Sequence, residues 1–289
     1  MKVRAYLAAC LLLVPASWGD ALSTPARAAV EIAYVEPVDP LHQNLHDVLR
    51  EHRALEQVQA VLSPFRLPRP VAMRIRGCNG HAEAWYHNAA ITVCYEYLQD
   101  VWQSAPGEGA STGLSRIDAI VGPLVDVFLH EFSHALFDLL AIPVLGREED
   151  AADQVAAFLM LQFHREEAGR LVRGTAHLYR TWMRHGSWFN RNSSFADVHG
   201  TPAQRLYNLL CIAYGADPEL FRELVEEEQL PRDRRDGCAE EYRQVAYAFQ
   251  QLIRPHVDEE AAKQVLSRRW LPAAEPALPS TRHDGPAKQ

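Results

Sequence analysis

The strongest constraint on the fold of this chain is a polar motif inside a long apolar segment. Residues 130–134 read HEFSH, and apolar side chains with the spacing of a buried helix run from Leu124 to Leu140. On a helix, the two histidines lie four residues apart on one face, so both imidazoles can bind one metal ion. Burying these polar groups without a partner would be costly, and a zinc ion supplies that partner. The motif therefore predicts a metal-binding helix in the core.

Each polar residue of the motif has its own expected role. His130 and His134 would bind one zinc ion, which is the cofactor that we expect. Glu131 lies beside them, where it can accept a proton from a metal-bound water as a general base. These three residues predict hydrolysis of a peptide or protein substrate. The alternative interpretation is a pair of solvent-facing histidines on an ordinary helix.

An acidic segment further along the chain offers the third protein ligand that a catalytic zinc site needs. It follows a break at Pro143 and Gly146, where the chain can turn back and begin a second helix. Glu149 is the predicted third ligand, with Glu148 as its competitor. Asp153 comes one turn after Glu149, where it could hydrogen-bond the outer nitrogen of a ligating histidine. Alternatively, the acidic residues only favour a helix N-terminus.

These motifs carry a resemblance to known peptidases. HExxH followed by ExxxD resembles the gluzincin zinc metallopeptidases, in which two histidines and a downstream glutamate bind zinc. The stretches HEFSHALFDLLAIPVLGREEDAADQ, CYEYL and LLCIAYG look like a bacterial family of exported proteins designated "putative metallopeptidase". The similarity covers residues 40 to 255. It implies a zincin-like fold and zinc-dependent hydrolysis of peptide bonds.

A second candidate cluster consists of Asp197, His199 and Arg205. The histidine and the arginine lie six residues apart across Pro202, which can open a helix. This is similar to the HPxxxxR signature of the integral-membrane zinc proteases that trim prenylated proteins, although Gly200 follows the histidine here where the signature has proline. His199 could donate to the oxyanion of peptide hydrolysis, Asp197 could orient it, and Arg205 could pair with a ligand carboxylate or the substrate backbone. The alternative is a helix start with an exposed histidine.

The remaining pattern predicts an α+β fold, a small antiparallel sheet packed on a mainly helical domain that carries the HExxH helix. Strands are expected at 71–76, 84–86 and 90–95. The last of these could be an edge strand that aligns an extended substrate, and the alternative is a plain sheet strand. Helices are expected at 41–62, 117–141, 148–168, 170–185, 202–214, 217–228 and 239–254.

The N-terminus has the features of a secretory signal peptide. Lys2 and Arg4 precede an apolar run over residues 5–16 that is too short to span a bilayer comfortably. We therefore expect an exported protein, periplasmic or secreted, with no transmembrane span in the mature chain. A lipoprotein box around Cys10 is the less favoured alternative. The expected segments are a signal peptide at 1–28, a linker at 29–40, a metallopeptidase-like domain at 41–269 and a disordered tail at 270–289.

Export also determines how the cysteines are interpreted. Cleavage would remove Cys10 and leave Cys78, Cys94, Cys211 and Cys238, an even number that suggests two disulfides in an oxidising compartment. Three pairings are possible, and the two local bonds, Cys78 with Cys94 and Cys211 with Cys238, are the simplest. Four unpaired thiols are the alternative.

Charge and composition restrict the partners. Of the 289 residues, 48% are hydrophobic, and the formal net charge is -8 without any long basic run. Nucleic acid is therefore not an expected partner, because phosphate binding needs clustered Lys and Arg. Two non-enzymatic alternatives stay open, an exported zinc-binding scaffold without turnover and an envelope interaction protein that holds no metal. The sequence leaves the oligomeric state undetermined.

Overall fold

The computed structural model describes residues 30–107, 113–184, 196–227 and 229–271. The expected signal peptide and nearly all of the expected tail lie outside the described residues, and so does Cys10.

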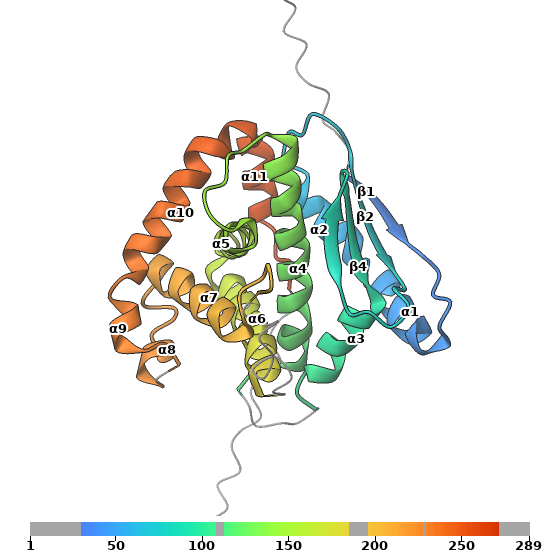
Figure 1. Ribbon diagram of the computed structural model, residues 1–289, viewed down its shortest axis with the longest axis horizontal. Coiled ribbons are helices and arrows are strands. Elements are labelled where there is room, and N and C mark those ends of the chain that lie inside the picture. The colour runs from blue at the N-terminus through green and yellow to red at the C-terminus, as the bar shows by residue number, and fades with distance from the viewer. Residues whose placement is uncertain (1–29, 108–112, 185–195, 228, 272–289) are drawn as a thin grey trace, which may run out of the picture.

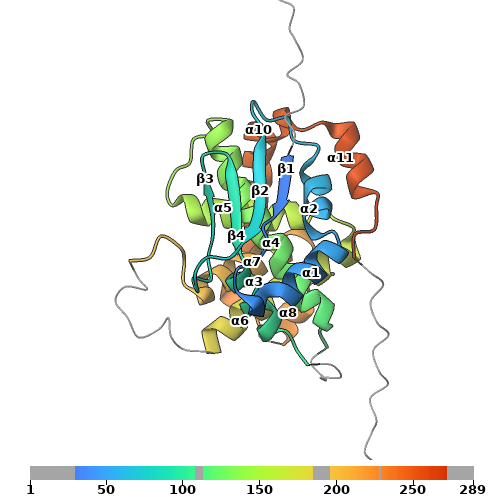
Figure 2. The same cartoon turned by 90° about the vertical axis from the view of Figure 1, so that its right-hand side faces the viewer.

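Four short strands form one mixed sheet. They are β1 (Val30–Tyr34), β2 (Val71–Arg76), β3 (Ala84–His87) and β4 (Ala90–Cys94). The strand order is β1-β2-β4-β3, and Figure 2 shows it with the sheet facing the viewer. β1 pairs parallel with β2 and β2 pairs parallel with β4, whereas β3 and β4 form an antiparallel hairpin. The expectation of a purely antiparallel sheet was therefore wrong.

The connections explain the mixed pairing. β1 lies inside the segment 29–40 that was expected to be a linker, and helices separate it from β2, which permits a parallel crossover. The hairpin turns at Asn88 and Ala89, whose φ angles of 48° and 58° suit a tight two-residue turn.

Helices make up most of the fold, and the α+β class is confirmed. They are η1 (Pro40–His42), α1 (Gln43–Glu51), α2 (Ala54–Leu62), α3 (Tyr95–Ser104), α4 (Arg116–Leu139), α5 (Glu148–Met160), α6 (Arg165–Arg184), α7 (Pro202–Ala216), α8 (Glu223–Glu226), α9 (Arg232–Arg235), α10 (Cys238–Leu252), η3 (Arg254–His256) and α11 (Glu259–Leu266).

Some expected helices differ in extent. The helix expected at 41–62 is broken, because Arg53 adopts a left-handed φ of 52° between α1 and α2. The helix expected at 217–228 is reduced to α8, since the Asp217 carboxylate accepts the Leu220 N–H and favours a turn there. α3, α9 and α11 had not been expected.

Helix α4 lies between the sheet and the helices α5, α6, α7 and α10 (Figure 1). It contacts α5 and α6 on one side and α3, β3 and β4 on the other. Among the described residues, α4 is the one helix long and apolar enough to cross a membrane, but 72% of its apolar window is buried inside the fold. Its side chains Phe128, Phe132 and Leu136 are fully buried in the core.

Two glycines let α4 and α6 approach backbone to backbone. A Cβ atom at Gly122 would lie 2.6 Å from the carbonyl oxygen of Leu171, and one at Gly174 would lie 2.0 Å from that of Asp118. Both distances are far below van der Waals contact. The close crossing therefore requires glycine at these positions, and it fixes α4 against the helical layer.

Both local disulfides are present. Cys78 bonds Cys94 at the end of β4, and Cys211 in α7 bonds Cys238 at the start of α10. The second bond joins α7 to α10, and both of these helices contact α5.

Candidate metal centre

The HExxH motif lies in the C-terminal half of α4, which is largely buried. His130 and Glu131 are only 3% and 5% exposed, and His134 faces the same way one turn later. The Nε2 atoms of the two histidines are 3.3 Å apart. This geometry follows from the four-residue spacing, which places both imidazoles on one face of α4.

Glu149 brings a carboxylate to the two histidines. After α4 the chain turns through Gly146, whose φ of 101° suits only glycine, and α5 begins two residues later. Glu149 Oε2 lies 3.0 Å from His130 Nε2 and 3.3 Å from His134 Nε2.

The spacing of these three donor atoms fits one zinc ion. Zinc ligands at bond lengths of about 2.0–2.2 Å in a tetrahedral site stand roughly 3.3–3.6 Å from one another. The three separations here are 3.0, 3.3 and 3.3 Å. Two imidazoles and one carboxylate are also a common ligand set of catalytic zinc sites.

A carboxylate contacts the outer nitrogen of each motif histidine. Asp153 Oδ1 lies 2.8 Å from His130 Nδ1, and Glu148 Oε1 lies 2.7 Å from His134 Nδ1. Such contacts orient an imidazole and turn its other nitrogen towards a metal. Glu148, which competed with Glu149 as third ligand in the sequence, thus sits behind His134 instead of among the Nε2 atoms.

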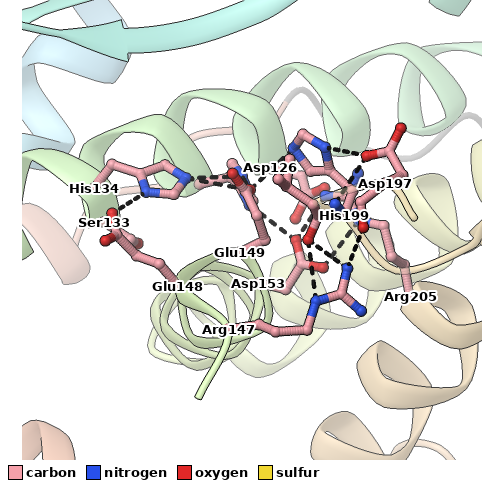
Figure 3. A network of polar contacts seen from close by, with 12 residues as sticks. Asp126, Ser133, His134, Arg147, Glu148, Glu149, Asp153, Asp197, His199 and Arg205 are labelled. Atoms are coloured by element: carbon pink, nitrogen blue, oxygen red, sulfur yellow. Dashed lines mark hydrogen bonds and ion pairs between the residues drawn. The ribbon is translucent and has the colours of Figure 1, made fainter. Parts of the chain in front are cut away.

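Arg205 supports the site from α7. Its guanidinium makes two hydrogen bonds to Asp153, of 2.9 Å to Oδ2 and 2.6 Å to Oδ1 (Figure 3). A capping box of Thr201 and Gln204, with Pro202 in the first turn, starts the helix that presents this arginine.

A buried extension of this network was not foreseen from the sequence. Arg205 stacks over the ring of Tyr179, and the Tyr179 hydroxyl donates a 3.0 Å hydrogen bond to Asp126. Asp126 lies in the apolar run four residues before His130, and therefore on the same face of the helix. This spacing could have identified Asp126 from the sequence. Tyr179 comes from α6, far away in the sequence, and had no such signal.

The loop 196–199 brings His199 into the same group. His199 Nε2 lies 2.9 Å from Glu149 Oε2, and Asp197 Oδ1 accepts the main-chain N–H of His199 at 2.9 Å and lies 3.2 Å from its Nδ1. Arg147, another residue missed by the sequence analysis, donates to the carbonyl oxygens of Asp197 and Val198. Figure 3 shows how Arg147 reaches from the start of α5 to this loop.

Charges in the group are strongly coupled. Burial alone would lower the pKa of His130, but its hydrogen bonds to Asp153 and Glu149 outweigh burial and raise the pKa to about 10. Burial would raise the pKa of Glu149, yet three histidines hold that pKa well below its usual range. Without a metal His130 is therefore protonated at neutral pH, and binding of a metal to its imidazole must release that proton.

Glu131 has a different environment from Glu149. Burial raises the pKa of its carboxyl, although the nearby His130 and His134 lower it in part. A glutamate with a raised pKa is better suited to accepting and returning a proton near neutral pH than an exposed one.

An open cleft of about 600 Å³ leads to these residues. It is lined by β3 residues Ala84–Tyr86, by Glu131 and His134 of α4, by residues 147–149 and by the loop 196–199. Glu131, His134, Glu149 and His199 therefore line a face that is open to solvent, whereas His130 is not part of this lining.

The edge strand beside the cleft is β3. An edge strand was one of two interpretations of residues 90–95, but β4 pairs with β2 on one side and β3 on the other. The Glu83 carbonyl accepts the Cys94 N–H, so these two residues form a hydrogen-bonded pair. Hydrogen-bonded and non-hydrogen-bonded pairs alternate along an antiparallel ladder. The main-chain N–H and C=O groups of Ala84 and Tyr86 therefore point away from β4. Both of these residues line the cleft.

Comparison with known proteins gives one match. A family model described as "Putative metallopeptidase" matches residues 34–253, which is most of the chain. No curated protein and no solved structure matches it.

Proposed function

The chain belongs to this "Putative metallopeptidase" family, and we propose that it is an exported zinc peptidase whose Glu131 activates the attacking water. The observation that carries the proposal is the convergence of His130 Nε2, His134 Nε2 and Glu149 Oε2, at 3.0–3.3 Å from one another, beside a buried glutamate. This group lies where an open cleft meets the core.

His130, His134 and Glu149 would hold the zinc ion. When bound there, zinc lowers the pKa of a water molecule and polarises a carbonyl group. Asp153 and Glu148 keep the two imidazoles oriented, and Arg205 in turn holds Asp153 in place. These outer contacts support a site that is rigid before substrate arrives.

Glu131 is the proposed general base. It takes a proton from the attacking water and then passes it to the amine that leaves when the peptide bond breaks. Its burial at the edge of the cleft keeps bulk water from competing for this proton. His199, oriented by Asp197, is the proposed donor to the oxygen on which negative charge develops.

The edge of β3 is the proposed substrate-binding strand. An extended peptide can add to an exposed sheet edge through main-chain hydrogen bonds, without requiring a particular side-chain sequence. The outward main-chain groups of Ala84 and Tyr86, next to Glu131 in the cleft lining, support this placement. Peptides and unfolded proteins are thus the proposed substrates.

Export of the protein is also part of the proposal. The two disulfides support it, because such bonds persist mainly in oxidising compartments. Fractionation of cells that express the chain, with mass spectrometry of the mature N-terminus, would show whether the protein is cleaved, lipid-anchored through Cys10 or retained inside.

The test of function compares Glu131→Gln with wild type on a fluorescent unfolded protein. We expect one zinc per chain in both and a loss of hydrolysis of about 10²–10⁴-fold in the variant. Full activity of Glu131→Gln would refute the mechanism, and stoichiometric zinc with no hydrolysis by wild type would favour the scaffold alternative.

A matched pair of variants tests the ligand assignment. Glu149→Gln should abolish tight zinc binding, because it removes a ligand. Glu148→Gln should weaken zinc binding by only about 10–100-fold, because it removes the partner of His134 Nδ1. Equal zinc loss in both variants, or greater loss in Glu148→Gln, would overturn the assignment.

A further inference from the structure

We propose that Tyr86 and Asp138 form a positioning pair, which holds the substrate-binding edge of β3 in place against the metal helix α4. The inference rests on the proposed function, because it takes β3 as the strand to which an extended peptide adds. Both residues act on the position of this strand. The side chain of Tyr86 anchors it, and the main chain of Tyr86 stays available to the peptide.

The first observation is a row of polar side chains along α4. Asp126, His130, His134 and Asp138 follow one another at every fourth position, which places them on one face of the helix. The two histidines belong to the candidate metal site, and Asp126 is bound by Tyr179 of α6. Asp138 ends the row one turn beyond His134, in a helix that contacts β3. A contact at Asp138 therefore fixes β3 relative to the histidines.

The second observation is the set of hydrogen bonds at the Tyr86 hydroxyl. It donates to Asp138 Oδ2 at 2.5 Å and accepts the main-chain N–H of Ala89 at 3.1 Å. Ala89 lies in the turn between β3 and β4. Burial, and after it the hydrogen bond to Asp138, raises the pKa of Tyr86 to about 12, so the hydroxyl keeps its proton at neutral pH. One oxygen atom thus connects the edge strand, its turn and α4.

Arg69 makes a weaker connection at the same place. Its Nη2 atom lies 3.5 Å from Asp138 Oδ2, and its Nη1 atom donates to Asn88 Oδ1 at 3.3 Å. The side chains of Arg69 and Asp138 are 48% and 51% exposed, and ion pairs between exposed side chains contribute little. The Tyr86 hydroxyl is therefore the main link between the turn and α4, and Arg69 offers a control.

The third observation is that separate contacts hold the other end of β3. Cys78, in the loop before the strand, is bonded to Cys94. The carboxylate of Glu96, in α3, accepts the main-chain N–H groups of Cys78 and Gly80, each at 2.9 Å. The start of β3 is thus attached to α3, whereas its end is attached to α4 through Tyr86.

A short edge strand needs both attachments if it is to bind a peptide well. β3 has four residues and pairs only with β4 among the described strands (Figure 2). If its end were loose, peptide binding would have to order it and would be weakened by that loss of conformational entropy. Loss of the Tyr86 hydroxyl should therefore weaken peptide binding and leave zinc binding by α4 and α5 unchanged.

Peptide binding without turnover tests the inference. The zinc-loaded Glu131→Gln variant serves as the background, and fluorescein-labelled casein, an unfolded protein, is the probe for fluorescence anisotropy. Adding Tyr86→Phe should raise the dissociation constant about tenfold, because a hydrogen bond to a charged group is lost. Asp138→Ala should give the same loss. Asp138→Asn keeps an acceptor for the hydroxyl and should give a smaller one.

A double variant and two controls separate the pair from a general loss of stability. Tyr86→Phe combined with Asp138→Ala should bind as weakly as either single variant, because both changes remove one contact. Tyr247→Phe, at a position that is 66% exposed on α10, and Arg69→Gln should change binding little. Zinc per chain and far-UV circular dichroism should be the same in all variants.

Steady-state kinetics give a second readout when Glu131 is restored. Tyr86→Phe should raise KM about tenfold and change kcat much less, because the hydroxyl positions the strand and not the reacting groups. A change that disturbed the metal site would instead lower kcat and the zinc content.

The outcomes separate this inference from the proposed function. An unchanged dissociation constant and KM in Tyr86→Phe, a loss of zinc in that variant, or independent losses that multiply in the double variant would overturn the pair and leave the peptidase intact. Weaker binding in both single variants, without hydrolysis by wild type, would support the pair and refute the peptidase. Absence of both probe binding and hydrolysis would refute both.

Discussion

Replacing Asp126 with asparagine should remove a loss of stability that the metal-free protein undergoes as the pH rises through about 6. Burial raises the pKa of Asp126 from 3.8 to about 6, although Arg205 lowers it in part. Because the pKa in the folded state is higher than in the unfolded state, this carboxyl contributes its full stability below about pH 4. That contribution is lost as the pH rises through about 6. The difference between a pKa of 3.8 and one of about 6 corresponds to about 3 kcal/mol.

Asparagine keeps the shape of the side chain and the acceptor for the Tyr179 hydroxyl, but it does not ionise. The free energy of unfolding of Asp126→Asn, minus that of wild type, should therefore increase by about 3 kcal/mol between pH 4 and pH 8. Urea unfolding of both proteins in the presence of a chelator, followed by circular dichroism at several pH values, measures this difference. Asp233→Asn on the exposed helix α9 is the matched control and should show no such trend.

The slope of this difference decides the outcome, whatever its offset. A difference that stays flat with pH would show that Asp126 titrates equally in the folded and unfolded states. A difference that falls as the pH rises would mean that Arg205 stabilises the ionised carboxylate more than burial penalises it. Either result would refute the argument.

Two further predictions concern stability. Gly174→Ala should destabilise the protein by about 3 kcal/mol or more, because the new Cβ atom would lie 2.0 Å from a main-chain oxygen of α4. Thermal unfolding measures this loss. Gly77→Ala is the control, since a Cβ atom there would have no other atom within 4 Å. Replacing Cys211 and Cys238 together with serine should cost about 3–4 kcal/mol, since the bond closes a loop across 27 residues, and an unchanged urea midpoint would contradict this expectation.

Local patterns explain which parts of the fold could be predicted. Helix α4 was expected at 117–141 and occurs at Arg116–Leu139, because its apolar period is long and uninterrupted. Strand pairing was harder, since β1 has five residues and its partner β2 lies across two helices. Nothing within such a short strand indicates whether it pairs parallel or antiparallel.

The same distinction applies to the site. The grouping of His130, His134 and Glu149 could be proposed because spacing on two consecutive helices implies it. Spacing did not separate Glu148 from Glu149, since both begin α5 and only the rotation of the helix decides which one faces the imidazoles. Tyr179 and Arg147 join the network through contacts between segments about fifty residues apart, which no local pattern records.

The residues of the candidate metal site and their supporting contacts come from segments at very different separations along the chain. His130 and Glu149 are 19 residues apart, whereas Arg205 contacts Asp153 across 52 residues. Closing a short loop costs less conformational entropy, so contacts between α4 and α5 can form before α7 is in place. A partly folded chain would then present an open set of two imidazoles and a carboxylate. Such a set binds Cu²⁺ more tightly than Zn²⁺, so the metal supply during folding would influence which ion the finished protein carries.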